Sequence, residues 1–376
     1  MDTIKDCIMT MLFYLYRVFP IVKNKIVVCS YLGRGYGGEG ELIVDKLLES
    51  GKDYDIVWLV RNPGEKMPKG VRAVKYLSPE SVKEQCTARV WIDNRRKAPY
   101  VRKRKGQYYI QVWHGSACIK YVEKDAEDTL KPIYIKGAKN DSKMADLFLA
   151  SSEWRYNNYK SAFWYDGEIA KGDLYQKYFK EENKPAMNKA VRKALGISLD
   201  KKILLYAPTF RKNQNLDCYN IDYDALLEAL QKKFGGEWVI VLRLHPNIAN
   251  KNTEFTYSDK VINGSLYPQI DDMIIASDIL ITDYSGCMFA GFKSGKIVML
   301  YTVDLEDYLK NERGLYYNFD EFPAPLSRSN EELISNVLNF DVDEYEKRRK
   351  ELTAKIGFYS NDGTELIAKR IEEIIG

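Results

Sequence analysis

Short apolar runs alternate with helical patterns along most of this chain. They cover 25–33, 55–60, 73–77, 88–93, 108–113 and 147–152 in the first half, and 202–207, 237–244, 278–283 and 296–301 in the second. Runs of about four to eight residues that are rich in Val and Ile are typical of strands buried on both faces. Because strands that alternate with helices form parallel sheets, the sequence predicts an α/β protein with two Rossmann-like, doubly wound halves that face a cleft.

The chain of 376 residues is too long for one ordinary core, so two domains are expected. The polar stretch 180–202 contains no strand pattern and is expected to connect them, with a short helix of its own. The predicted domains are therefore 1–180 and 181–376, and the second ends in an amphipathic helix over 363–376.

Composition narrows the class of protein only in part. Hydrophobic residues make up 45% of the chain and charged residues 29%, which is ordinary for a globular protein. The mean hydropathy of −0.41 excludes a polytopic membrane protein. The net charge of +4 points to no particular partner, and the six cysteines contain no CxxC pair, so we expect reduced thiols of a cytosolic protein and no zinc site.

The N-terminal segment allows two interpretations. Its apolar part, from about 7 to 16, is shorter than the roughly 20 residues of a spanning helix, and it lacks the basic start and cleavage site of a secretory signal. It could be a helix at a membrane surface, or a helix packed on the first domain. In the first case the residues at the headgroup level would be Phe13, Tyr14, Tyr16 and Phe19, with Lys5 and Arg17 on the wet side.

The stretch 94–106 is the most basic part of the chain, with seven Lys or Arg residues between two predicted strands. One interpretation is a solvated loop. The other is contact with an anionic partner, either phospholipid headgroups or a phosphate-rich acceptor. Nucleic acid is not expected, because no nucleic-acid-binding motif accompanies the charge.

The chain contains two histidines, and both follow an apolar run directly. His114 comes after 108–113, and His245 comes after 237–244. Ligands of open parallel sheets bind beyond the carboxyl ends of the strands. A single histidine in such a place is more often structural, but two in the same topological position of different halves favour a shared functional site.

Other polar residues follow strands of the second half. Thr209 and Arg211 come after 202–207, Arg243 comes before His245, and 278–283 leads into Asp283, Tyr284, Ser285 and Gly286. A hydroxyl and free N–H groups at a helix N-terminus suit a phosphate, and arginine can bind phosphate oxygens in bidentate fashion. The alternatives are a plain N-cap for Ser285 and solvated salt bridges for the arginines. Together these residues favour a nucleotide diphosphate site.

Several familiar motifs are missing or incomplete. There is no GxxxxGK[ST] phosphate loop, and the stretch 33–40, "GRGYGGEG", is not a clean GxGxxG, so we interpret it as a flexible loop that lines the cleft. DxD patterns at 53–55, 222–224 and 341–343 lie in polar settings at helix edges, and we expect no metal and no cofactor.

The motifs "QVWHGSACIK", "LYAPTFR", "RLHPN" and "ITDYSG", with "FPIVKNKIVVCSYLG", "DIVWLVRN" and "ARVWIDN" upstream, resemble the CDP-glycerol glycerophosphotransferases of teichoic acid and capsule synthesis. The resemblance covers about 20–320, and the length is similar to that of the short, primase-type members. It implies a glycosyltransferase-B (GT-B) architecture with the acceptor on the N-terminal domain and the CDP donor on the C-terminal one. It also implies a bacterial enzyme, peripheral on the cytoplasmic face of the membrane.

The implied reaction moves a polyol phosphate from a CDP-polyol to a hydroxyl of a lipid-linked or polysaccharide acceptor and releases CMP. By the same resemblance His114 is the general base, beside Gly115 and Ser116 on the acceptor side. The donor phosphates would be held by His245, Thr209, Arg211 and Ser285, with Arg313 in a further motif. The chain departs from the family pattern at Ser116-Ala117, Ser285-Gly286 and Phe289-Ala290, and it lacks a Gly-x-Pro-Arg element near 170, so both glycerol and ribitol donors stay open.

Two rival functions remain open at this point. One is a nucleotide-sugar glycosyltransferase of the same architecture. The other is a non-catalytic protein that binds anionic lipid or nucleic acid through the stretch 94–106.

Overall fold

The computed structural model describes residues 2–209, 211, 216–244, 255–311 and 314–376. They divide into two compact units. Unit 1 comprises Met1–Ser116, Val122–Gln176 and Phe358–Gly376, and unit 2 comprises Ala117–Tyr121 and Lys177–Gly357. The predicted division into 1–180 and 181–376 differs from this in three places. The C-terminal helix belongs to unit 1, a five-residue piece of the N-terminal half belongs to unit 2, and the main boundary lies four residues earlier, after Gln176.

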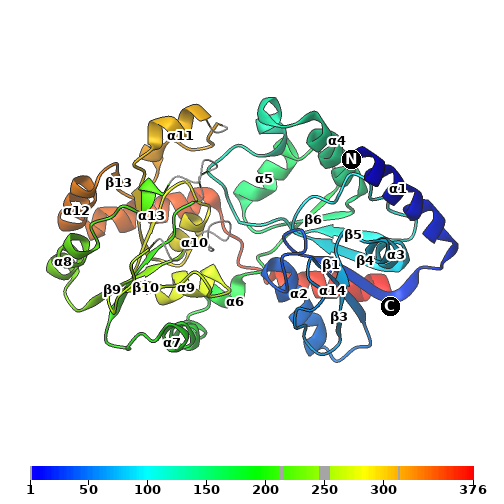
Figure 1. Cartoon of the computed structure of the whole chain (residues 1–376), viewed down its shortest axis with the longest axis horizontal. Coiled ribbons are helices and arrows are strands. Elements are labelled where there is room, and N and C mark those ends of the chain that lie inside the picture. The colour runs from blue at the N-terminus through cyan, green and yellow to red at the C-terminus, as the bar shows by residue number, and fades with distance from the viewer. Residues whose placement is uncertain (1, 210, 212–215, 245–254, 312–313) are drawn as a thin grey trace. The chain divides into compact units, whose positions relative to one another are not determined.

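Unit 1 contains a seven-stranded parallel sheet in the order β3-β2-β1-β4-β5-β6-β7 (Figure 1). Its strands are β1 (Val22–Cys29), β2 (Asp55–Val60), β3 (Val71–Lys75), β4 (Ala88–Asp93), β5 (Tyr108–Gln111), β6 (Leu147–Ala150) and β7 (Glu168–Lys171). All six strands predicted for the first half are present. The prediction missed β7 because this edge strand, "EIAK", has exposed charged ends instead of an apolar run.

Helices cover both faces of this sheet. They are α1 (Asp2–Leu15), α2 (Gly38–Glu49), α3 (Pro79–Thr87), α4 (Pro132–Met144), α5 (Glu153–Ala162) and α14 (Gly363–Ile375), with 3₁₀ turns at Tyr16–Val18 and Glu123–Thr129. Helix α14 packs against α2. It buries Ile367 and Ile371, and Lys46 forms a 2.8 Å ion pair with Glu365. These contacts are the reason why the C-terminal helix joins unit 1.

Unit 2 contains a six-stranded parallel sheet in the order β10-β9-β8-β11-β12-β13. The strands are β8 (Lys202–Tyr206), β9 (Trp238–Leu242), β10 (Val261–Asn263), β11 (Ile279–Thr282), β12 (Ile297–Tyr301) and β13 (Leu326–Ser327). The helices are α6 (Gln176–Phe179), α7 (Lys184–Leu195), α8 (Tyr223–Phe234), α9 (Ile270–Ala276), α10 (Cys287–Lys293), α11 (Leu305–Asn311), α12 (Asn330–Leu338) and α13 (Val342–Ile356), with 3₁₀ turns at Asp217–Tyr219 and Phe319–Glu321. The four predicted strands form the middle of the sheet, and the short edge strands β10 and β13 were missed.

The two sheets share one topology. Each begins with its central strand, adds two strands on one side and then continues on the other, which is the doubly wound order. In such a sheet the carboxyl ends of the central strands lie at one edge, where the chain reverses direction between the two sides. The predicted motifs follow β5, β8, β9 and β11, so within each unit they lie at the edge where ligands of this fold bind.

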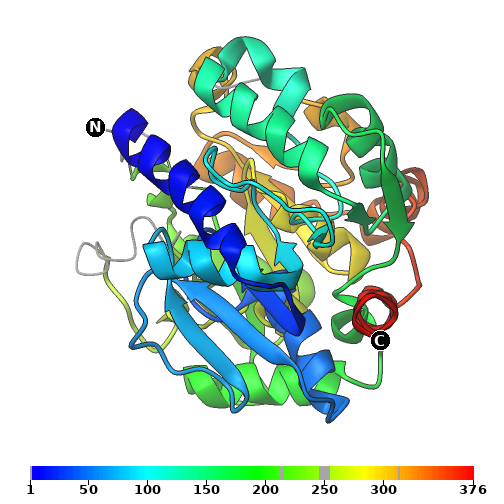
Figure 2. The same ribbon diagram turned by 90° about the vertical axis from the view of Figure 1, so that its right-hand side faces the viewer.

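Helix α1 packs on α3 (Figure 2). Met9 and Phe13 are buried in the core of unit 1, and the thiol of Cys86 on α3 contacts the Phe13 carbonyl at 3.3 Å. The prediction that Phe13 lies at a membrane surface is therefore wrong, because this ring fills the core. The exposed large apolar residues of the segment are Ile4, Ile8, Met11, Tyr14, Leu15, Val18 and Phe19. Within the described part of the chain, no helix is long and apolar enough to cross a bilayer.

Most charges of the basic stretch 94–106 are used inside unit 1. Arg96 is buried and forms ion pairs with Glu123 at 2.9 Å and Asp141 at 3.1 Å, and buried Lys97 pairs with Asp93 at 2.6 Å. Arg102 and Arg104 donate to backbone carbonyls, and Lys103 pairs with Asp146. Arg95 and Lys105 have exposed side chains, and Arg102, Lys103 and Arg104 are partly exposed. A fully solvated loop therefore does not describe the stretch, and contact with an anionic partner stays a prediction.

Candidate functional site

The loop that carries His114 follows β5, and side chains at the start of α5 fix it by hydrogen bonds. Gly115 has a φ of 77°, so the backbone turns sharply after the histidine. Arg155 Nε donates to the Gly115 carbonyl at 3.1 Å, and Ser152 Oγ donates to the Ser116 carbonyl at 2.5 Å. Arg155 and Ser152 are both buried. The two residues predicted for the acceptor side therefore form a turn that the interior of unit 1 fixes.

The imidazole of His114 has a defined orientation. Its Nδ1 lies 2.9 Å from the backbone carbonyl oxygen of Asn94, the residue that follows β4. The ring stacks on Trp113, with centroids 4.7 Å apart, and the Tyr31 ring meets it edge-on at 6.0 Å. A carbonyl oxygen can only accept, so Nδ1 carries the proton and Nε2 keeps its lone pair. The geometry thus presents Nε2 as a proton acceptor.

The charges around His114 also favour the neutral ring. Burial, followed by the positive charges of Arg95 and Arg155, lowers its pKa to about 3, against the opposing effect of the Asn94 carbonyl. The imidazole is therefore neutral at pH 7, which a general base requires.

Asn94 and Glu39 support this arrangement, and the sequence analysis missed both. Asn94 Nδ2 donates to Glu39 Oε2 at 2.6 Å, and the backbone N–H of Tyr31 donates to Asn94 Oδ1 at 2.7 Å. Asn94 is 1% exposed and Glu39 is 3% exposed. Glu39 lies in the first turn of α2, inside the stretch 33–40 that we predicted to be a flexible loop. The sequence signal that could have identified Glu39 is a carboxylate within a glycine-rich stretch after the first strand.

A small hollow adjoins the His114 loop within unit 1. Its walls come from the carboxyl ends of β5, β6 and β7 and from the start of α2. Its lining includes carboxylates and hydroxyls but no Lys or Arg, so it suits the hydroxyl groups of a ligand better than a phosphate. The lining residues are Glu39, Val112, Gly115, Ser116, Leu149, Ser151, Gly172, Asp173, Leu174 and Tyr175.

In unit 2, Thr209, Arg211 and Asp283 form one cluster after β8 and β11. Asp283 Oδ1 accepts the backbone N–H of Thr209 at 2.8 Å, and Oδ2 accepts the Thr209 hydroxyl at 3.0 Å. Arg211 Nη1 forms an ion pair with Asp283 Oδ2 at 2.8 Å. The carboxylate of Asp283 is fully buried, so this cation and these donors balance its charge.

A second carboxylate, Asp304, completes the cluster and was not predicted. Arg211 Nε donates to its Oδ2 at 2.5 Å, and the Tyr284 hydroxyl donates to its Oδ1 at 3.0 Å. The Tyr284 ring stacks on Tyr308 with centroids 3.5 Å apart. Burial by itself would raise the pKa of Asp304, but the hydrogen bonds and charge of Arg211 lower it below its usual range. The fork of Arg211, predicted to bind phosphate, is thus directed at two carboxylates.

Ser285 and Gly286 precede helix α10. The Ser285 hydroxyl is half-buried and accepts the backbone N–H of Cys287 at 3.3 Å, whereas Gly286 is exposed. Ser285 is nevertheless not the N-cap of α10, because that position is Gly286 and no side chain caps the helix. Helix α10 has only seven residues, so its dipole is weak.

Arg243 has surroundings unlike those of Arg211. Its Nη1 donates to the Tyr267 carbonyl at 2.6 Å and lies 3.0 Å from the Met273 sulfur. Among the residues that the structure describes, no carboxylate lies within ion-pair distance of it. Burial lowers the pKa of Arg243, and the charge of Asp271 only partly opposes this. Arg243 is therefore a cation whose charge is available to an anion.

His245 and Arg313, also predicted site residues, lie outside the described residues. The flank of Arg313 is nevertheless informative. The backbone N–H of Tyr121 donates to the Gly314 carbonyl at 2.7 Å, and that of Tyr316 donates to the Ile119 carbonyl at 2.8 Å. The segment 117–121, which begins three residues after His114, is thus bonded into unit 2 beside the Arg313 motif.

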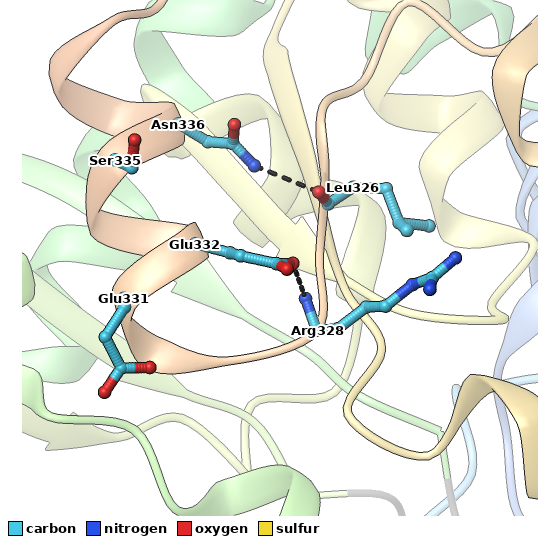
Figure 3. A pocket seen from close by; sticks show the side chains of 6 residues that line it. All are labelled: Leu326, Arg328, Glu331, Glu332, Ser335 and Asn336. Carbon is cyan, nitrogen blue, oxygen red and sulfur yellow. Dashed lines mark hydrogen bonds between the residues drawn. The ribbon is translucent and has the colours of Figure 1, made fainter.

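A broad hollow in unit 2 is lined by residues of β13 and α12 and by Arg328 between them (Figure 3). Glu332 accepts the backbone N–H of Arg328 at 2.7 Å, and Asn336 Nδ2 donates to the Leu326 carbonyl at 3.0 Å. These bonds connect the edge strand β13 to α12. None of the predicted site residues lines this hollow, and we assign it no role in chemistry. In the described ranges, no group of three potential ligand side chains could hold a metal ion.

Comparison with known proteins gives consistent matches along the chain. A family model described as CDP-Glycerol:Poly(glycerophosphate) glycerophosphotransferase matches residues 10–373. The "Teichoic acid poly(glycerol phosphate) polymerase" of Staphylococcus epidermidis is 27% identical over 347 residues, which cover 88% of this chain and 47% of that protein. The "Teichoic acid glycerol-phosphate transferase" of Staphylococcus aureus is 26% identical over 372 residues, 93% of each chain.

The chain spans about half the length of the Staphylococcus epidermidis polymerase and of its Bacillus subtilis counterpart. Among solved structures, that of the wall teichoic acid polymerase TagF has a TM-score of 0.84 and 25% identity, over 98% of this chain and 93% of that one. This likeness and the two sheet orders confirm the predicted fold class, two Rossmann-like, doubly wound domains of GT-B type. The cleft between the halves stays a prediction.

Proposed function

Because the chain belongs to the CDP-glycerol:poly(glycerophosphate) glycerophosphotransferase family, we propose that it transfers a polyol phosphate from a CDP-polyol to a hydroxyl of a membrane-linked acceptor. The donor is CDP-glycerol or CDP-ribitol, the acceptor is a glycan or a polyol phosphate chain, and CMP is released. The observation that carries this proposal is His114, a neutral imidazole whose Nδ1 is bonded to a carbonyl, which leaves Nε2 as the proton-accepting nitrogen of the ring.

In the proposed mechanism, Nε2 of His114 accepts the proton of the acceptor hydroxyl while the hydroxyl oxygen attacks the β-phosphorus of the donor. The bond between that phosphorus and the bridging oxygen breaks, and CMP leaves with the electron pair. Such phosphoryl transfer depends mainly on positioning and on offsetting negative charge. The hollow beside Gly115 and Ser116, with its hydroxyls and carboxylates, supports an acceptor site in unit 1.

Unit 2 supplies the donor side of the proposal. Arg243 is the strongest candidate for a direct phosphate contact, because its described partners are carbonyl oxygens and a sulfur. Arg211 and Asp283 fix the ends of β8 and β11, where Thr209 and Ser285 lie. We keep Ser285, Gly286, His245 and Arg313 as proposed donor contacts.

A donor screen tests the function directly. We expect the purified chain, incubated with membranes that contain polyol phosphate acceptors, to release CMP from CDP-glycerol or CDP-ribitol and to release no UDP from UDP-sugars. Mass spectrometry of the product reports which polyol was added and how many units. Release of UDP with transfer of a sugar would instead support the nucleotide-sugar glycosyltransferase. Salt-sensitive lipid binding with no nucleotide release would support the non-catalytic alternative.

We further propose that the protein works at the cytoplasmic face of the membrane and binds lipid through α1. Ile4, Ile8, Met11 and Leu15 recur at spacings of four and three residues, which places them on one helix face, and all four are exposed. Lys5 is exposed beside them. An apolar helix face flanked by a cation suits an anionic lipid surface.

We expect the double variant Ile8→Glu, Met11→Glu to lower binding to vesicles of phosphatidylcholine and phosphatidylglycerol by about tenfold or more, because each buried apolar side chain contributes roughly 1.5–3 kcal/mol. Co-sedimentation measures this binding. The matched control is Leu199→Glu, an exposed leucine of unit 2 that should leave vesicle binding unchanged. Equal binding of wild type and double variant would contradict this role of α1.

A further inference from the structure

Three residues from separate elements of unit 1 form a chain of contacts that ends on the imidazole of His114. Glu39 comes from α2, Asn94 follows β4, and His114 follows β5. Glu39 Oε2 accepts Asn94 Nδ2 at 2.6 Å, and the backbone carbonyl of Asn94 lies 2.9 Å from His114 Nδ1. A general base is commonly oriented by a third group of this kind.

We propose that Glu39 is a positioning residue for His114. By holding Asn94, it keeps the Asn94 carbonyl on Nδ1, so that the proton stays there and Nε2 remains the proton acceptor. This inference rests on the proposed function of His114 as a base. It concerns the tautomer of the ring, which can be observed without turnover.

Asn94 is held at both ends of its side chain. Its Oδ1 accepts the backbone N–H of Tyr31 at 2.7 Å, and its Nδ2 has Glu39 as acceptor. Tyr31 has a φ of 46°, a conformation that costs free energy unless neighbouring contacts impose it, and its ring packs edge-on against His114. Loss of the Glu39 carboxylate would leave the buried amide of Asn94 without an acceptor and would release Tyr31 as well.

A carboxylate suits this position because it can accept several hydrogen bonds at once. Besides Asn94, the hydroxyls of Tyr31 and Tyr175 and the backbone N–H of Glu39 itself lower the pKa of the carboxyl, although burial raises it overall. No Lys or Arg forms an ion pair with Glu39 in the described part of unit 1. The carboxyl group is thus held by hydrogen-bond donors, Asn94 among them, which it fixes in turn.

The test uses the scarcity of histidine in this chain. With only two imidazoles, long-range ¹H–¹⁵N spectra of histidine-labelled protein resolve both, and the variant His245→Gln assigns His114. We expect wild-type His114 at pH 7 to be neutral with its proton on Nδ1. In Glu39→Ala we expect a mixture of tautomers, because the Asn94 carbonyl is no longer fixed. An unchanged Nδ1–H tautomer in a folded Glu39→Ala protein would overturn the proposal.

A swapped pair keeps the test valid if Glu39→Ala does not fold. Asn94→Asp places two carboxylates against each other and should disturb the tautomer. In the double variant Glu39→Gln, Asn94→Asp, the side chain at 39 can donate a hydrogen bond and the side chain at 94 can accept it, the reverse of the wild type. This variant should recover the wild-type tautomer of His114. If Asn94→Asp disturbs the tautomer and the double variant does not restore it, the contact between residues 39 and 94 does not determine the tautomer of His114.

Activity provides the second readout. We expect Glu39→Ala to lower kcat by about 10- to 100-fold, the range known for the hydrogen-bond partners of metal-ligating histidines, with unchanged affinity for CDP-glycerol. The exposed Glu49 of the same helix is the matched control, and Glu49→Ala should change neither quantity. If the Nδ1–H tautomer of the wild type is disturbed in Glu39→Ala but the wild type transfers nothing from any CDP-polyol, the proposed function is contradicted and the positioning role of Glu39 is supported.

Discussion

Replacement of His114 by alanine is expected to lower kcat by roughly 100-fold or more, because a positioned general base contributes about that much to a proton transfer. The affinity for CDP-glycerol should stay unchanged, since the donor contacts are proposed in unit 2. Release of CMP in a single-turnover assay measures the first quantity and isothermal titration calorimetry the second. Turnover close to that of the wild type would exclude His114 as the base.

The pH dependence of the same reaction follows from the surroundings of His114. Only the neutral ring can accept a proton, and burial together with Arg95 and Arg155 lowers its pKa to about 3. The acidic limb of kcat/KM, which reports the free enzyme, should therefore lie well below pH 6.5. A bound pyrophosphate would raise the pKa of the ring, so the acidic limb of kcat should lie at higher pH than that of kcat/KM. An acidic limb of kcat/KM at or above pH 6.5 would contradict this environment.

The central strands of both sheets could be predicted from sequence because their environment is uniform. β1, β2 and β4 in unit 1, and β8, β9 and β11 in unit 2, are covered on both faces, so their sequences are continuous apolar runs. β7, β10 and β13 lie at sheet edges and are short, so the same signal is weak there. Fold class depends on the central strands and was predicted correctly.

The position of the candidate residues at strand ends could also be predicted, because strand ends are visible in the sequence. Thr209, Arg243, Asp283 and His114 each follow a strand as expected. What could not be predicted is which polar residue pairs with which, since those contacts join segments far apart in the chain. Arg211 illustrates this point, because a free arginine and one that is paired with Asp283 look the same in sequence.

Buried polar residues explain the remaining errors. Glu39, Asp304 and the charged side chains of 94–106 carry residue types that are usually exposed, so patterning places them at the surface. Glu39, Arg96 and Lys97 are buried because a partner elsewhere in the fold satisfies each of them, as Asn94 does for Glu39, and Asp304 is partly buried against Arg211. Phe13 is the reverse case, an aromatic ring near a terminus whose burial depends on packing against α3.

The largest effect on stability is expected at Arg211. Substitution with methionine keeps much of the side-chain volume but leaves the fully buried carboxylate of Asp283 without its cation. Breaking a buried pair in this way costs about 3–5 kcal/mol in the free energy of unfolding. Asp304→Asn should cost less, about 1 kcal/mol, because Asp304 is only partly buried and Asp283 keeps its partner. Urea unfolding of the full chain, followed by circular dichroism, measures both.

The matched control for Arg211→Met is Arg72→Met in unit 1. Arg72 also bridges two carboxylates, Asp55 at 2.8 Å and Glu84 at 3.3 Å, but its side chain is 48% exposed. That substitution should cost about 1 kcal/mol or less, because water screens an exposed pair. Equal costs for the two methionine variants would show that burial of Asp283 does not determine the strength of the cluster.

The pH dependence of stability adds a second comparison. The lowered pKa of Asp304 stabilises the fold above about pH 4, and this contribution is lost as the pH falls through the lower, folded-state pKa. The stability of Arg211→Met should therefore decrease less than that of the wild type on acidification.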